Sequence, residues 1–170
     1  MGKYDFFESL QRHTTRDIHI TVENYLSNLK NTEKNEKSGK NIILGATRIA
    51  YMLGLISKDT ASHYHYDAIY KKVEYEISPF GYYEEKYEKI AALSIKEAKA
   101  LPATKAKEMI ETYILFLLDV MKKINTTENF YYVIDGVTKF AVFLQLFDYK
   151  EAAKYCAEAY VKDGTNFRGF

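Results

Sequence analysis

Apolar residues recur at helical spacing through most of the chain. Ile18, Val22, Tyr25 and Leu29 follow one another at intervals of four, three and four residues, which places them on one helical face. The same period predicts helices over residues 4–12, 15–30, 42–53, 57–77, 83–98, 103–123, 130–144 and 149–161. The helix over 103–123 has the widest apolar arc, so we expect it to lie at the centre of the domain.

Short breaks separate these predicted helices. Gly54 follows the last periodic residue of one helix, and Ser57 is a suitable N-cap for the next. At Ser78-Pro79-Phe80-Gly81 the residue before proline is biased away from helical geometry, and glycine permits a turn. We therefore expect a compact all-α bundle of six to eight helices joined as helical hairpins.

Two segments lack helical periodicity. Residues 31–40 contain no apolar side chain and predict a solvated loop, and residues 163–170 predict an irregular tail. The roughly thirty residues before the loop are too few to bury a core of their own. Since 47% of the chain is apolar and 28% is charged, typical of a globular protein, we expect one helical domain over 1–170.

Charge and cysteine content narrow the possible partners and compartment. Twenty-four basic and 23 acidic residues leave a net charge of +1, so no overall field attracts nucleic acid or a membrane surface. The single cysteine, Cys156, excludes a disulfide within the chain, which fits a reducing, cytoplasmic location. The longest apolar run, Tyr113 to Leu118, is much shorter than the ~20 residues of a membrane span.

Motifs of catalysis and cofactor binding are missing from the sequence. It contains no GxSxG, GxxxxGK[ST] or GxGxxG pattern, and Cys156 lies within an alanine-rich helical face. His63 and Asp67 have the i, i+4 spacing of a shared metal ligand pair, but no second pair completes a site. We expect a protein that is not an enzyme and that has no metal site or cofactor.

Residues 47–64 resemble a DNA-binding helix-turn-helix, with Ala50 and Gly54 at the expected separation. The resemblance implies a DNA-binding regulator, with DNA contacts from the set Arg48, Lys58, Thr60, Ser62 and Lys71. The turn is one residue longer than that motif has, and the second helix is rich in His, Tyr and Asp. Together with the near-neutral charge, these departures disfavour nucleic acid as the partner.

Residues 146–159 resemble the turn and second helix of a tetratricopeptide repeat, with Tyr149, Ala152 and Ala159 at matching positions. Phe147 and Cys156 depart from that pattern, and the segment does not recur at a period of 34 residues. An ordinary packed pair of helices explains the same residues.

Tyrosine is the one compositional anomaly. The chain has sixteen tyrosines and no tryptophan, and seven of the tyrosines lie between positions 64 and 87. They cannot all face one core, and exposed tyrosine is enriched at protein interfaces. The predicted partner-binding residues are Tyr64, Tyr66, Tyr70, Tyr82, Tyr83 and Tyr87.

The expected function is therefore a non-catalytic protein–protein interaction or adaptor domain. It would bind a protein partner or form a homodimer through a tyrosine-rich helical hairpin. A second alternative to this function, besides DNA binding, is a small phage or mobile-element inhibitor, or an immunity-type protein, that acts by binding a target protein. Small size, a composition rich in Lys, Ile, Asn and Tyr, and the missing catalytic motifs favour that alternative.

Overall fold

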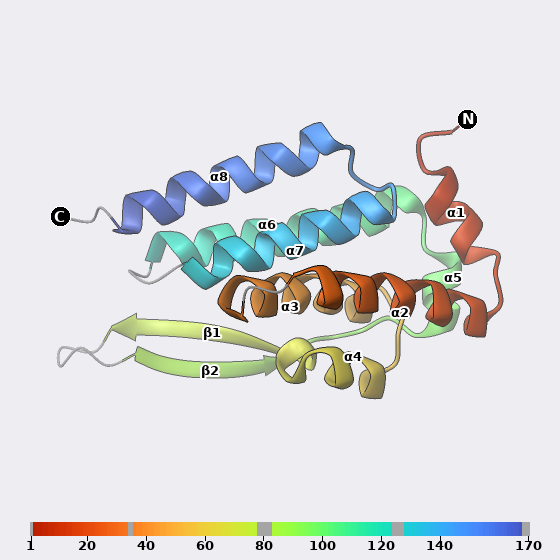
Figure 1. The fold of residues 1–170 in the computed structure, drawn as a ribbon, viewed down its shortest axis with the longest axis horizontal. Coiled ribbons are helices and arrows are strands. Elements are labelled where there is room, and N and C mark those ends of the chain that lie inside the picture. Colours follow the sequence, from red (N-terminus) through yellow and green to blue (C-terminus); the bar gives the residue numbers. More distant parts are fainter. Residues whose placement is uncertain (1, 34–35, 78–82, 124–127, 168–170) are drawn as a thin grey trace.

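Figure 1 shows the computed structural model, which describes residues 2–33, 36–77, 83–123 and 128–167. These residues form eight α-helices, a 3-10 helix and two strands: α1 (Asp5–Gln11), α2 (Thr15–Thr32), α3 (Glu36–Met52), α4 (Lys58–Tyr64), η1 (Tyr66–Ile69), β1 (Tyr70–Ile77), β2 (Tyr83–Lys89), α5 (Ile95–Ala100), α6 (Ala103–Lys123), α7 (Glu128–Phe143) and α8 (Tyr149–Phe167). The prediction of an all-α bundle of six to eight helices is confirmed, and a two-stranded hairpin is added to it.

The long helices are stacked in layers. α6 and α7 lie between α8 on one side and α2 with α3 on the other (Figure 1). The strands and α4 lie on the outer side of α3, away from α8. Ile110, Ile114 and Leu117 of α6 are fully buried and the helix lies in the middle layer (Figure 1), as expected, although its Leu115 is 56% exposed.

The closest helix pair is α3 with α7, and two glycines make it possible. A Cβ atom on Gly45 would overlap the carbonyl oxygen of Val133 and lie 2.9 Å from the amide nitrogen of Val137. A Cβ atom on Gly136 would overlap the carbonyl oxygen of Ile42 and lie 2.7 Å from its carbonyl carbon. The two backbones are therefore in direct contact, which any larger residue at either position would prevent.

Two predicted helix boundaries are confirmed. Gly54 has a φ of +73° just after α3, a conformation that favours glycine. Ser57 caps α4, because its side-chain oxygen accepts a hydrogen bond from the Thr60 amide.

The helix predicted over 57–77 is wrong beyond Tyr64. α4 has only seven residues, and after η1 the chain is extended from Tyr70. The prediction over 83–98 is also wrong in its first half, where β2 replaces a helix and only α5 is helical. The turn predicted at Ser78–Gly81 lies outside the described residues.

Both non-helical predictions also need correction. α2 continues to Thr32 and α3 begins at Glu36, so helix occupies most of the segment predicted as a loop over 31–40. Residues 34 and 35 lie outside the described part of the chain. α8 runs to Phe167, so residues 163–167 of the predicted tail are helical, while 168–170 lie outside the description.

Candidate interaction surface

The strands form an antiparallel hairpin, which we call the arm (residues 70–77 and 83–89). Tyr70 is opposite Lys89, and the pairing continues in register to Glu74 opposite Glu85. An irregularity follows between Glu74 and Ile77. Figure 1 shows the arm extending along the helices as a separate layer.

A buried arginine fixes the base of the arm to the helices. Arg48 in α3 is only 2% exposed. Its guanidinium donates to the carbonyl oxygen of Tyr70 at 2.6 Å, to that of Asp67 at 3.3 Å, and to the hydroxyl of Tyr113 in α6 at 2.8 Å. Among the described residues no carboxylate pairs with it. Arg48 therefore joins α3, α6 and the first residue of β1 through hydrogen bonds to neutral groups.

This position rules out the role predicted for Arg48 in DNA binding, since a buried guanidinium cannot reach a phosphate. Lys71 is also held within the molecule, with its Nζ 3.5 Å from the ring centroid of Phe116. Lys58 is exposed, Thr60 lies in the capped first turn of α4, and Ser62 is half-buried. The structure therefore does not gather the five predicted DNA contacts on one surface.

The predicted partner-binding tyrosines divide into exposed and anchored residues. Tyr66, in η1, is 77% exposed and Tyr87, in β2, is 50% exposed. Tyr70 is half-buried, and its ring lies edge-on to that of Tyr87, with 6.4 Å between the centroids. Tyr70 and Tyr87 are therefore in contact at the base of the arm, and Tyr66 lies in η1, the element directly before β1.

The other three predicted tyrosines do not add to this group. Tyr64 is half-buried, and its hydroxyl donates to the carbonyl oxygen of Glu23 at 3.1 Å and lies 2.7 Å from the hydroxyl of Ser27. It anchors α4 to α2, so its inclusion among the contact residues is not supported by its position. Tyr82 lies outside the described residues, as does the side chain of Tyr83, the first residue of β2.

Two lysines of the arm lie on the same face as Tyr70 and Tyr87. Side chains of every second residue share a face, so Tyr70 and Lys72 of β1 lie on the same face as Tyr87 and Lys89 of β2. We call these four residues, together with the exposed Tyr66 of the preceding η1, the tyrosine face. The lysines were missed in the sequence analysis because the helices predicted over 57–77 and 83–98 put Lys72 and Lys89 on other sides than their neighbouring tyrosines.

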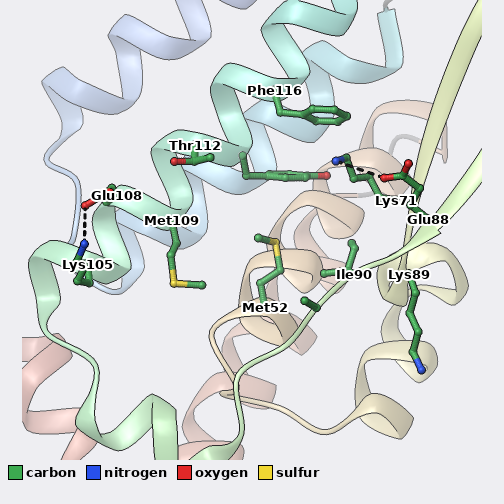
Figure 2. A pocket seen from close by; sticks show the side chains of 12 residues that line it. Met52, Lys71, Glu88, Lys89, Ile90, Lys105, Glu108, Met109, Thr112 and Phe116 are labelled. Atoms are coloured by element: carbon green, nitrogen blue, oxygen red, sulfur yellow. Dashed lines mark ion pairs between the residues drawn. The ribbon is translucent and has the colours of Figure 1, made fainter.

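The opposite face of the arm borders a groove of about 540 Å³ along α6 (Figure 2). Met52, Ile90, Met109 and Phe116 provide its apolar lining. Ion pairs lie at its two ends: Lys71 is 3.9 Å from Glu88, and Lys105 is 3.5 Å from Glu108. Because these charged groups pair with one another, the groove offers mainly apolar contact.

The histidines near the arm do not form a metal site. α4 ends at Tyr64, so His63 and Asp67 are not one turn apart on a helix. No group of three or more His, Cys, Asp or Glu side chains in the described part of the chain is placed to hold a metal ion.

His65 has a structural role instead. Its Nδ1 accepts a hydrogen bond from the Asp67 amide at 3.2 Å, which begins η1. Burial lowers the pKa of His65 from 6.5 to about 4, with Arg48 and Lys40 acting in the same direction and Asp67 against it. The neutral ring must carry its proton on Nε2, because Nδ1 is the acceptor.

Comparison with protein-family models, with curated proteins and with solved structures finds no match to this chain. In the described ranges, no helix has both the length and the apolar character needed to cross a lipid bilayer.

Proposed function

We propose that the chain is a non-catalytic protein-binding domain that contacts its partner through the tyrosine face. The observation that carries this proposal is the exposure of two tyrosines: Tyr66 in η1, directly before the arm, and Tyr87 in β2, whose ring contacts Tyr70 at the base of the arm. Tyrosine contributes a large contact area with few rotatable bonds and a hydroxyl for hydrogen bonding.

The anchoring of the arm supports the same function. The Arg48 hydrogen bonds hold Tyr70, and with it the base of β1, against α3 and α6. A surface on a fixed element loses little conformational entropy when it binds. Tyr149 and Tyr160 are also exposed, at 82% and 67%, but they lie eleven residues apart on α8, away from any sheet edge. Tyr149 and Tyr160 therefore serve as control positions in the following experiment.

The test is affinity capture from the source cells with three forms of the protein. We expect Tyr66→Ala/Tyr87→Ala to lose a partner that the wild type retains, and Tyr149→Ala/Tyr160→Ala to retain it. Circular dichroism and thermal unfolding would check that both double variants are folded. Equal capture by all three forms would contradict the proposal, and loss only in the α8 variant would place the interface elsewhere.

The inhibitor or immunity-type alternative uses the same surface. An adaptor and an inhibitor both bind a protein, and they differ in whether the partner loses activity when it is bound. Assaying the captured partner with and without this protein therefore decides between the two.

A further inference from the structure

We infer that the outer edge of β2 is a self-association site, where β2 of a second copy pairs in an antiparallel register centred on Tyr87. This inference rests on the proposed function, because it names a second copy of the chain as a partner of the arm. It follows from three observations: which edge of the arm is open, which backbone groups point to that edge, and the order of charges along β2.

The two edges of the arm are in different surroundings. On β1, the Tyr70 carbonyl oxygen points away from β2 and accepts from Arg48 of the helical body. In Figure 1, β1 lies between the helices and β2, and β2 forms the outer side of the arm. No described element forms a strand ladder with β2 apart from β1. An open strand edge of this kind is a template for pairing with another chain.

The hydrogen-bond pattern shows which residues present their backbone at this edge. The Ile90 amide donates to the Ile69 carbonyl at 3.0 Å, next to the Tyr70–Lys89 pair. In an antiparallel ladder hydrogen-bonded and non-hydrogen-bonded pairs alternate, so Glu88 and Lys86 turn their backbone groups towards β1. The amide and carbonyl groups of Lys89, Tyr87 and Glu85 consequently point outward.

Symmetry then limits the possible registers. Two identical antiparallel strands related by a twofold axis must place one residue opposite its own copy. Hydrogen bonds across the new edge form wherever outward-pointing residues are opposite one another, and a centre at any of residues 85–89 meets this condition. A centre at Glu85, Lys86, Glu88 or Lys89 sets two like charges directly opposite each other, which is destabilising. Tyr87 is the uncharged choice among the five.

The sequence of β2 is complementary to itself about Tyr87. Residues 85–89 read Glu-Lys-Tyr-Glu-Lys. With Tyr87 opposite Tyr87 of the second copy, Lys86 is opposite Glu88, and Glu85 is opposite Lys89. Each of these contacts occurs twice in the dimer, so four cross-strand pairs of opposite charge surround a tyrosine pair, and Glu88 also lies 3.9 Å from Lys71 of its own copy. A four-stranded sheet results, with one arm from each copy.

Charge exchange at the outermost pair tests this register. In Glu85→Lys both positions of the pair are basic, and in Lys89→Glu both are acidic, so each single variant replaces two attractive contacts with two repulsive ones. We expect dimerisation of each to be weaker by about tenfold or more. The combined variant Glu85→Lys/Lys89→Glu restores opposite charges and should dimerise like the wild type. An equimolar mixture of the two single variants should form a one-to-one heterodimer.

Sedimentation velocity over a range of concentrations would measure these associations, with Lys96→Glu on exposed α5 as the matched control for a charge change away from the arm. Thermal unfolding would show that every variant is folded. The predicted set of results is a dimer for the wild type, the control, the combined variant and the mixture, and weaker association for each single variant. A wild type that is monomeric at about 100 μM, or single variants that dimerise as well as the wild type, would overturn the inference.

Failure of this inference and failure of the proposed function give different results. If the wild type is monomeric and Tyr66→Ala/Tyr87→Ala still loses a captured partner, the self-pairing is wrong and the proposed function stands. If the charge variants behave as predicted but capture of other proteins does not depend on the tyrosines, β2 pairs with itself and the tyrosine face is not a site for other partners.

Discussion

The direct contact between α3 and α7 makes Gly45→Ala and Gly136→Ala strongly destabilising. In an isolated helix the same change would favour folding by about 1 kcal/mol, because alanine has the higher helix propensity. Here the new methyl group overlaps a backbone carbonyl oxygen of the neighbouring helix, which cannot move aside as a side chain could. The helices must separate by roughly 1 Å, and overpacking of this kind costs about 1–3 kcal/mol or more, together with lost dispersion contacts.

We expect each substitution to lower the free energy of unfolding by about 2 kcal/mol after the propensity gain is included. Urea unfolding followed by circular dichroism would measure this change. Ala157→Gly at an exposed position of α8 is the control, since it measures the propensity difference alone, about 1 kcal/mol. If Gly45→Ala or Gly136→Ala stabilises the protein by the amount the control predicts, α3 and α7 are not in backbone contact and the described packing is wrong.

Two further predictions concern the base of the arm. Arg48→Lys keeps the buried charge but loses the planar guanidinium that reaches Tyr70 and Tyr113 together. We therefore expect the free energy of unfolding to fall by about 1–3 kcal/mol, and amide exchange to become faster in the arm than in the helices. Unchanged exchange over residues 70–89 would contradict the anchoring role. Because the pKa of His65 is lowered to about 4 in the folded state, the unfolded state takes up the proton first, and stability falls as the pH drops from about 6.5 to 4. His65→Asn, which retains an acceptor for the Asp67 amide, should remove about 2 kcal/mol of the stability difference between pH 7 and pH 5. Equal pH dependence in both proteins would show that His65 is not the titrating group.

The helical bundle was predictable because its apolar stripes are long. In α6, the buried residues recur at three- and four-residue spacing over 21 residues, and such a stripe has no strand interpretation. The N-cap at Ser57 and the helix end at Gly54 were also predictable, because local backbone geometry alone determines them.

The arm could not be recognised from periodicity alone. Ile69, Val73 and Ile77 have the i, i+4 spacing of a helix, but Val73, Tyr75 and Ile77 also alternate with Glu74 and Glu76 as in a strand. Short segments with both patterns are decided by tertiary contacts. Here Arg48 takes up the carbonyl oxygens of Asp67 and Tyr70, which a continuing helix would need for its own hydrogen bonds.

The candidate surface was predicted only in part, because tertiary contacts also decide which side chains meet there. The abundance of tyrosine pointed to the right region, and Tyr66 and Tyr87 are exposed there. Which tyrosines share a face depends on the strand register, and the anchoring of Tyr64 depends on a hydrogen bond to Glu23 in a distant helix. Neither follows from spacing along the chain.

Site-specific photo-crosslinking would show whether partners contact the base of the arm. A benzophenone-bearing phenylalanine analogue would replace Tyr66, Tyr87, Tyr149 or Tyr160 one at a time, and mass spectrometry would identify the adducts formed in the source cells. We predict adducts, including those with a second copy of the chain, from positions 66 and 87 and none from 149 and 160. Adducts formed only from the α8 positions would contradict the account.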